Sequence, residues 1–218
     1  MDIFKILHSA NITIHVLAGS IALLLGAIAL LTRKGQQAHI KSGRWFIVLL
    51  SIVIVTGLIG VFVFRRNTFL LVITILAGYN GFSGYRVLLT KSNKPKLVDV
   101  LAAVISLFSV LYFLYYFKRI GMIWTPVIIY STVGALLLVI SYDFVRYFIP
   151  ASSYKKFWIY EHIYKMIGAF SALLAAFTGT VFSAYQPYSQ VLPSVLGVLL
   201  QLSFIIFWHP KNSKSRIL

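Results

Sequence analysis

The chain contains five histidines, and the spacing around two of them suits the ligation of a cofactor. His15 and His39 each lie four residues before a glycine, at Gly19 and Gly43. On a helix this spacing places the glycine one turn away on the same face, which leaves room beside the imidazole. A porphyrin needs such room next to its axial ligand. His162 completes the set at the start of another apolar segment, so His39, His162 and His15 are the candidate ligands of a b-type haem.

The same types of side chain also bind metal ions. His39, Asp143 and His162 could hold zinc or iron, and a membrane hydrolase uses such ligands to activate water. The sequence has no His-Glu-x-x-His motif that would place two ligands on one helix, so these ligands would have to converge from different helices. It also has no cysteine, no serine nucleophile motif and no glycine-rich phosphate loop. A metal-dependent membrane enzyme is therefore the first alternative to a haem protein.

Acidic residues are rare, with four Asp and Glu against 20 Lys and Arg. Glu161, in the stretch YEHIYKM, precedes Lys165 by four residues, a spacing that brings two side chains together on a helix. We predict that this pair lies at the membrane interface, near the lipid headgroups. Asp143 is followed three residues later by Arg146, which predicts an ion pair within one helix.

Polar residues also fall within apolar segments of the chain. Asn80, Arg86 and Asp143 are in this position, and we expect them to face the protein interior because a polar group that faces lipid is costly. For Asn80 we predict a structural hydrogen bond between helices. The helical face that contains it should pack inward, and it consists of Ile73, Ala77, Asn80, Gly84 and Val87. A carrier of a small solute or of protons is the second alternative function, with His15, Asn80 and Asp143 as relay points.

Membrane-spanning helices must position these side chains. Hydrophobic residues make up 60% of the 218 residues and charged residues 11%, and the mean hydropathy is +0.90. A soluble domain is nearer half apolar and a quarter charged, so the solvent of this chain must be lipid. Runs of about 20 apolar residues can cross the hydrocarbon as helices. We predict an all-α membrane protein, a single domain over residues 1–218, with seven transmembrane helices at 12–31, 45–64, 69–89, 97–117, 122–145, 163–185 and 188–208.

Basic residues predict the orientation of this bundle, because cytoplasmic loops retain Lys and Arg. They cluster after the first, third and fifth predicted spans and in the C-terminal tail. This pattern places the N-terminus outside and the C-terminus in the cytoplasm, with His39, Asp143 and His162 near the cytoplasmic face. The net charge of +16 then reflects topology and attraction to anionic lipids at that face. We expect the lipid bilayer, and no nucleic acid, as the partner.

Five segments carry a resemblance to a known family: IHVLAGSIALLLGAIAL, AHIKSGRW, GFSGYRVL, SYDFVRYF and EHIYKMIGAFSALLAAF. They resemble a family of bacterial predicted membrane proteins known as domain of unknown function 2306. The resemblance covers most of the chain and implies the seven-helix fold and a bacterial inner (cytoplasmic) membrane, but no reaction. It also implies recurrent polar positions, which fall on His15, His39, Arg86, Asp143 and His162.

From these observations we expect a redox or cofactor-binding protein with a b-type haem near the cytoplasmic face. Several histidines in an apolar bundle are similar to those of small haem-b membrane cytochromes. A metal-dependent enzyme, a small-solute or proton carrier, and an accessory subunit of a membrane complex are the alternatives.

Overall fold

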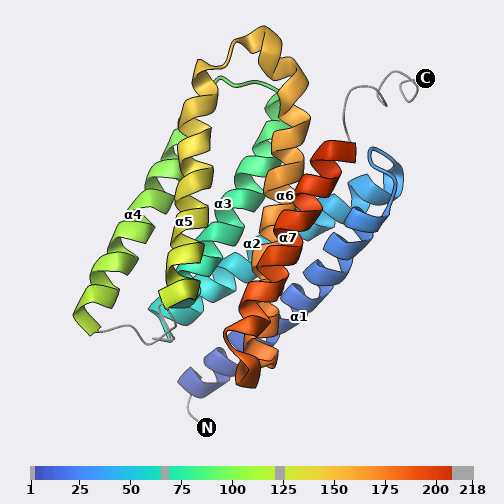
Figure 1. Ribbon diagram of the computed structural model, residues 1–218. Coiled ribbons are helices and arrows are strands. Elements are labelled where there is room, and N and C mark those ends of the chain that lie inside the picture. Colours follow the sequence, from blue (N-terminus) through green and yellow to red (C-terminus); the bar gives the residue numbers. More distant parts are fainter. Residues whose placement is uncertain (1–2, 65–68, 121–125, 208–218) are drawn as a thin grey trace.

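Helices account for nearly all of the regular structure in the computed structural model, which describes residues 3–64, 69–120 and 126–207 (Figure 1). No strand occurs within these ranges, so the prediction of an all-α protein is confirmed. Two short 3-10 helices, Arg146–Phe148 and Ser183–Tyr185, follow two of the long helices. The long helices are α1 (Ile3–Leu31), α2 (Gln37–Phe62), α3 (Phe69–Thr90), α4 (Leu97–Ile120), α5 (Pro126–Val145), α6 (Ala151–Val181) and α7 (Tyr188–Phe207).

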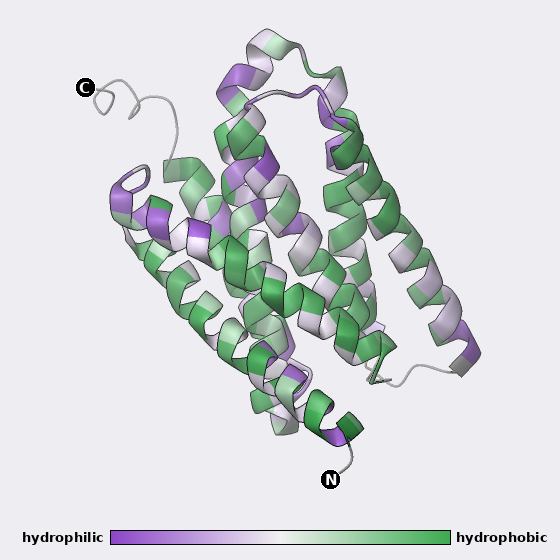
Figure 2. Cartoon of the chain, turned by 180° about the vertical axis from the view of Figure 1, so that it is seen from behind, coloured by the Kyte–Doolittle hydropathy of each residue, from purple (hydrophilic) through white to green (hydrophobic). Residues whose placement is uncertain are grey.

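Within the described residues, six helices are long and apolar enough to cross a membrane: α1, α2, α4, α5, α6 and α7. Large apolar side chains project outward from them, such as Leu24 of α1, Leu138 of α5 and Ile206 of α7. Figure 2 shows mostly hydrophobic residues along the helices, with hydrophilic residues concentrated near the ends. Such an extensive apolar surface suits lipid. The fold is therefore that of a multi-pass membrane protein, while the seventh span stays a prediction.

The remaining helix, α3, has a polar second half and a central place in the bundle. Asn80, Ser83 and Arg86 lie in that half, and Tyr79 directly precedes it. The helix packs against α2, α4, α5 and α6 (Figure 1). A helix surrounded by other helices needs little lipid-facing apolar surface, so it tolerates these polar residues. Its predicted inward face is confirmed, because all five members are buried: Ile73, Ala77, Asn80, Gly84 and Val87.

Several helices extend beyond the predicted spans. α6 begins at Ala151 although the predicted span begins at 163, and α2 begins at Gln37 although the predicted span begins at 45. An apolar run marks only the part of a helix inside the hydrocarbon, whereas the helical turns continue past it. His39, Glu161 and His162 consequently lie within helices. The predicted span positions 122–125 and 208 lie outside the described residues.

A glycine allows α3 and α6 to approach closely. A Cβ atom built on Gly84 would lie 2.9 Å from Cβ of Lys165 and 3.3 Å from Sδ of Met166. Small residues at such crossings let the backbones of membrane helices come together. This contact holds the polar half of α3 beside Lys165.

Gly84→Ala should therefore destabilise the protein by about 1–3 kcal/mol, because the added methyl group overpacks the crossing of α3 and α6. Gly134→Ala is the matched control, since a Cβ at Gly134 would meet no heavy atom within 4 Å. The measurement is thermal unfolding of both variants in detergent. Equal melting temperatures for the two variants would contradict this account of the crossing.

Candidate functional site

Four charged side chains are buried together between α5 and α6, and we call them the buried ion cluster: Asp143, Arg146, Glu161 and Lys165. Their exposed fractions are 4%, 5%, 3% and 0%, respectively. Charged residues inside membrane segments are costly and rare, and they mark ion or proton pathways in many membrane proteins. The buried ion cluster is therefore the candidate functional site.

The charges of the cluster alternate around a closed ring. The Nζ atom of Lys165 donates hydrogen bonds to Oδ1 of Asp143 and, at 2.7 Å, to Oε1 of Glu161. Nη1 of Arg146 donates to the same Glu161 oxygen, and its Nε lies 3.5 Å from Oδ1 of Asp143. Each carboxylate thus faces both cations, and two positive charges balance two negative ones. This neutrality is what makes the burial of four charges tolerable in a medium of low dielectric.

Tyrosine hydroxyl groups satisfy the second oxygen of each carboxylate. Tyr79 of α3 donates to Oδ2 of Asp143 at 2.7 Å, and Tyr154 of α6 donates to Oε2 of Glu161 at 2.6 Å. Nη1 of Arg146 donates in turn to the Tyr154 hydroxyl oxygen at 3.0 Å. The tyrosines therefore extend the hydrogen-bond network from the cluster into α3 and toward the start of α6.

Local sequence explains how the four charges meet. Asp143 lies in the last turn of α5, and Arg146 follows at the start of the 3-10 helix. Pro150 precedes α6 as its N-terminal capping position, and the chain turns there so that α6 packs against α3, the helix that α5 also contacts. Glu161 and Lys165 lie on the face of α6 that meets this end of α5. The predicted pairs at spacings of three and four residues are both present, and they form one cluster.

Glu161 and Lys165 do not face the lipid headgroups as a surface pair, while their depth in the membrane stays a prediction. Both are buried, because α6 begins well before its apolar run and carries these residues below the helix end. The composition did contain a signal for the cluster. All three acids in the described part of the chain, Asp99, Asp143 and Glu161, form ion pairs, so none serves as a simple surface charge.

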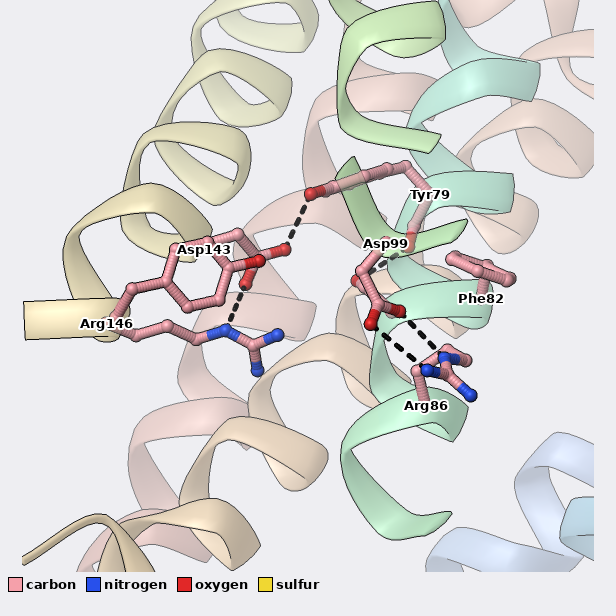
Figure 3. Close-up of a pocket in the computed structure, with 8 residues that line it drawn as sticks. Tyr79, Phe82, Arg86, Asp99, Asp143 and Arg146 are labelled. Atoms are coloured by element: carbon pink, nitrogen blue, oxygen red, sulfur yellow. Dashed lines mark hydrogen bonds and ion pairs between the residues drawn. The ribbon is translucent and has the colours of Figure 1, made fainter. Parts of the chain in front are cut away.

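A second ion pair joins the end of α3 to the start of α4. Nε and Nη2 of Arg86 donate to the two carboxylate oxygens of Asp99 at 2.7 and 3.1 Å. The backbone N–H of Lys96 also donates to Asp99 at 2.9 Å. Figure 3 shows a cavity between this pair and the buried ion cluster. Its volume is about 10 Å³, and its lining consists of Tyr79, Phe82, Ser83, Arg86, Asp99, Asp143, Arg146 and Tyr147.

Two of the three histidines predicted as cofactor ligands contact a backbone carbonyl oxygen through Nδ1. Nδ1 of His162 lies 3.0 Å from the Gly84 carbonyl oxygen, and Nδ1 of His39 lies 3.0 Å from that of Ala29. A carbonyl oxygen only accepts hydrogen bonds, so Nδ1 carries a proton in both rings, and in a neutral ring Nε2 then carries the lone pair. Ala29 lies in the last turn of α1, so the bond from His39 helps to cap the end of that helix. The same carbonyl oxygen also accepts a hydrogen bond from Lys34 Nζ at 2.9 Å. Burial lowers the pKa of the Lys34 ammonium group.

His39 and His162 lie at the same end of the bundle. Figure 1 shows α2 and α6 both starting at that end, and Phe46 of α2 packs against Phe170 of α6 with ring centroids 6.4 Å apart. His39 precedes Phe46 by seven residues and His162 precedes Phe170 by eight, which are rises of about 10 and 12 Å. The two imidazoles therefore lie at a similar level along the bundle.

The other predicted residues lie apart from this pair. His15 contacts the Thr56 hydroxyl at 2.9 Å, between α1 and α2. Asn80 is buried, but it donates to Leu76 of its own helix, so the predicted hydrogen bond between helices is not made by its amide nitrogen. Among the described residues, no group of three His, Asp or Glu side chains could hold a metal ion. The structure therefore does not assemble His39, Asp143 and His162 into one metal site.

Comparisons with known proteins leave this geometry as the basis for function. No family model, no curated protein and no solved structure matches the chain. The resemblance to domain of unknown function 2306 stays a prediction.

Neutrality of the cluster predicts how it responds to mutation. Lys165→Met leaves two buried carboxylates with one cation and should destabilise the protein by about 3–5 kcal/mol. The double variant Lys165→Met/Glu161→Gln restores the balance of charge and should recover most of this loss. Lys118→Met on the exposed end of α4 is the control and should change stability by at most about 0.5 kcal/mol. Chemical denaturation in detergent measures the stability of all three variants. If Lys165→Met is as stable as the wild type, the charge-balance account is contradicted.

Proposed function

We propose that this multi-pass membrane protein carries protons, and that the buried ion cluster is its proton-transfer site. The observation that carries the proposal is the fully buried ammonium group of Lys165, which donates hydrogen bonds to both Asp143 and Glu161. A chain of titratable groups in hydrogen-bond contact inside a membrane protein is the arrangement that proton relays use.

The relay step requires no group from outside the cluster. Lys165 passes a proton to Asp143, so that the Nζ–H bond breaks as the Oδ1–H bond forms and both groups become neutral. The neutral amine then accepts a proton that has reached Glu161. Burial penalises charged forms, so the neutral pair of amine and carboxylic acid is nearer in energy to the ion pair than it is in water. One proton has then moved from Glu161 to Asp143.

Arg146 keeps its charge throughout this cycle, because a guanidinium group does not lose its proton in proteins. It contacts Glu161 directly and lies beside Asp143. It therefore supplies a fixed positive charge that offsets the negative charge left on one carboxylate when the other is protonated. Tyr79 and Tyr154 hold the two carboxylates in place through their outer oxygens.

The topology predicted from basic residues would place this cluster near the cytoplasmic face of a bacterial inner membrane. The positive-inside pattern of the loops supports this orientation, and the same Lys and Arg residues would attract anionic lipids there. Protons would then be exchanged with the cytoplasm at the end of the bundle where Arg86 and Asp99 lie.

Proton flux into liposomes tests the proposal. Purified protein should acidify pyranine-loaded vesicles under a pH gradient with valinomycin and potassium present. Glu161→Gln keeps the shape and the hydrogen-bond acceptor but loses the titratable group, so flux per folded protein should fall at least about tenfold. The charge-balanced double variant Lys165→Met/Glu161→Gln should show the same loss while it remains stable. Lys118→Met, on the exposed end of α4, should transport like the wild type. Equal flux in wild-type and protein-free vesicles, or full flux in Glu161→Gln, would overturn the proposal.

A second candidate function, binding of a b-type haem, rests on the imidazole tautomers. In His39 and His162 the Nδ1–H group donates to a backbone carbonyl, which orients the ring and leaves the Nε2 lone pair for a ligand. A Cβ on Gly43 would meet no heavy atom within 4 Å, so there is room one turn from His39. A haem held by these residues would supply one-electron transfer.

A visible spectrum of protein from haem-replete cells tests this second function. We expect a Soret band that His39→Ala and His162→Ala each remove, because each variant lacks one axial ligand. His8 lies near the N-terminal end of α1, whereas His39 contacts the other end of that helix, so His8→Ala should keep the band. Purified wild-type protein without a Soret band would rule out the haem.

A further inference from the structure

Four buried side-chain atoms in the described part of the chain have no hydrogen-bond partner: Asn80 Oδ1, Arg146 Nε, Ser189 Oγ and Gln190 Oε1. Nearly all buried polar atoms in proteins have a partner, and an ordered water supplies it where the protein does not. Three of the four residues are more than nine-tenths buried: the exposed fraction is 2% for Asn80, 5% for Arg146 and 7% for Gln190. These atoms therefore call for a common explanation.

The unpartnered atoms of these three residues lie at successive levels along α6. Arg146 contacts Glu161 at the start of the series. Asn80 Oδ1 would lie 3.2 Å from a Cβ built on Gly168, and Gln190 Nε2 would lie 2.6 Å from a Cβ built on Gly179. From 161 to 179 the helix rises about 27 Å. The hydrocarbon core is about 30 Å thick, so the series extends over most of a membrane.

Other buried polar groups lie between these three levels. Gln201 of α7 donates to the Tyr164 carbonyl oxygen at 2.9 Å, and Ser171 donates to the carbonyl oxygen of Pro193 at 2.9 Å. Near the far end, Thr178 donates to the Ser189 carbonyl oxygen at 2.6 Å. The contact between α6 and α7 is thus polar at successive turns, in a bundle whose other contacts are mainly apolar.

At the Arg146 end the cavity shown in Figure 3 fits a single water molecule. Its volume of about 10 Å³ is close to the least that a water needs, and its lining offers polar partners of both signs. Arg146 Nε lies 3.5 Å from Asp143 Oδ1 as an ion pair but makes no hydrogen bond on this lining, and Asp99 connects the cavity to the Arg86 pair. A water here would link the outer ion pair to the buried ion cluster.

We infer that Arg146 Nε, Asn80 Oδ1 and Gln190 Oε1 bind water molecules, and that these waters lie on a proton route along α6 from the Arg86–Asp99 pair to the start of α7. The inference rests on the proposed function for the proton, and on the unpartnered atoms for the waters. Water at each position both donates and accepts, so it can serve as one station of the route, and the polar side chains of Gln201, Ser171 and Thr178 lie between the stations.

Asn80→Leu and Gln190→Leu test the route, because each removes one water-binding oxygen and retains most of the side-chain volume. Each should lower proton flux in liposomes about tenfold, the factor that corresponds to the loss of one hydrogen bond of about 1.4 kcal/mol. Ser106→Ala is the control, since Ser106 is a buried hydroxyl on α4 away from the route, and its flux should match the wild type. Both leucine variants should fold, because they remove an acceptor that lacks a protein partner.

The outcomes separate this inference from the proposed function. If Glu161→Gln stops flux while both leucine variants transport like the wild type, the route is wrong and the proton-transfer site stands. If Glu161→Gln transports fully, the proposed function fails, and the water positions are judged by a high-resolution structure of the full-length wild-type protein. Ordered water within hydrogen-bond distance of all three atoms supports those positions, and its absence from them overturns the inference.

Discussion

The ammonium group of Lys165 between two carboxylates is the interaction on which the rest of the structure depends. A single buried cation needs one counter-charge, and here it has two, so a second cation must be present to balance the set. Arg146 meets this need from the end of α5. Gly84 allows α3 to approach Lys165, and Tyr79 then reaches Asp143 from α3. Side chains of α3, α5 and α6 thus meet at one buried cluster.

Stability alone gives little reason for such a cluster. Apolar side chains of similar volume often stabilise a protein interior as well as a buried ion network does, or better. Retaining four charges in an apolar bundle therefore favours a role in which charge or protons move. Three buried polar atoms near α6 make no hydrogen bond to the protein, and water is the ordinary partner of such atoms.

Sequence patterns predicted the helices and the inward face of α3, because both depend on local hydrophobic spacing. They also predicted the pairs Asp143 with Arg146 and Glu161 with Lys165, since these residues are three and four positions apart. The joining of the two pairs could not be predicted. It depends on how α5 and α6 both pack against α3, and on Tyr79 of that helix, which lies 64 residues before Asp143. The apolar run also did not reveal that α6 begins at Ala151, so Glu161 was predicted as a surface residue although it is buried.

Infrared difference spectroscopy of the carboxyl groups tests the central claim most directly. After a drop in pH, the wild-type protein should gain the C=O stretching band of a protonated carboxylic acid while it remains folded. Asp143→Asn and Glu161→Gln should each change or remove that band, because the proton resides on these two groups during the relay. If both carboxylates stay ionised at every pH at which the protein is folded, the cluster holds fixed charges only and does not transfer protons.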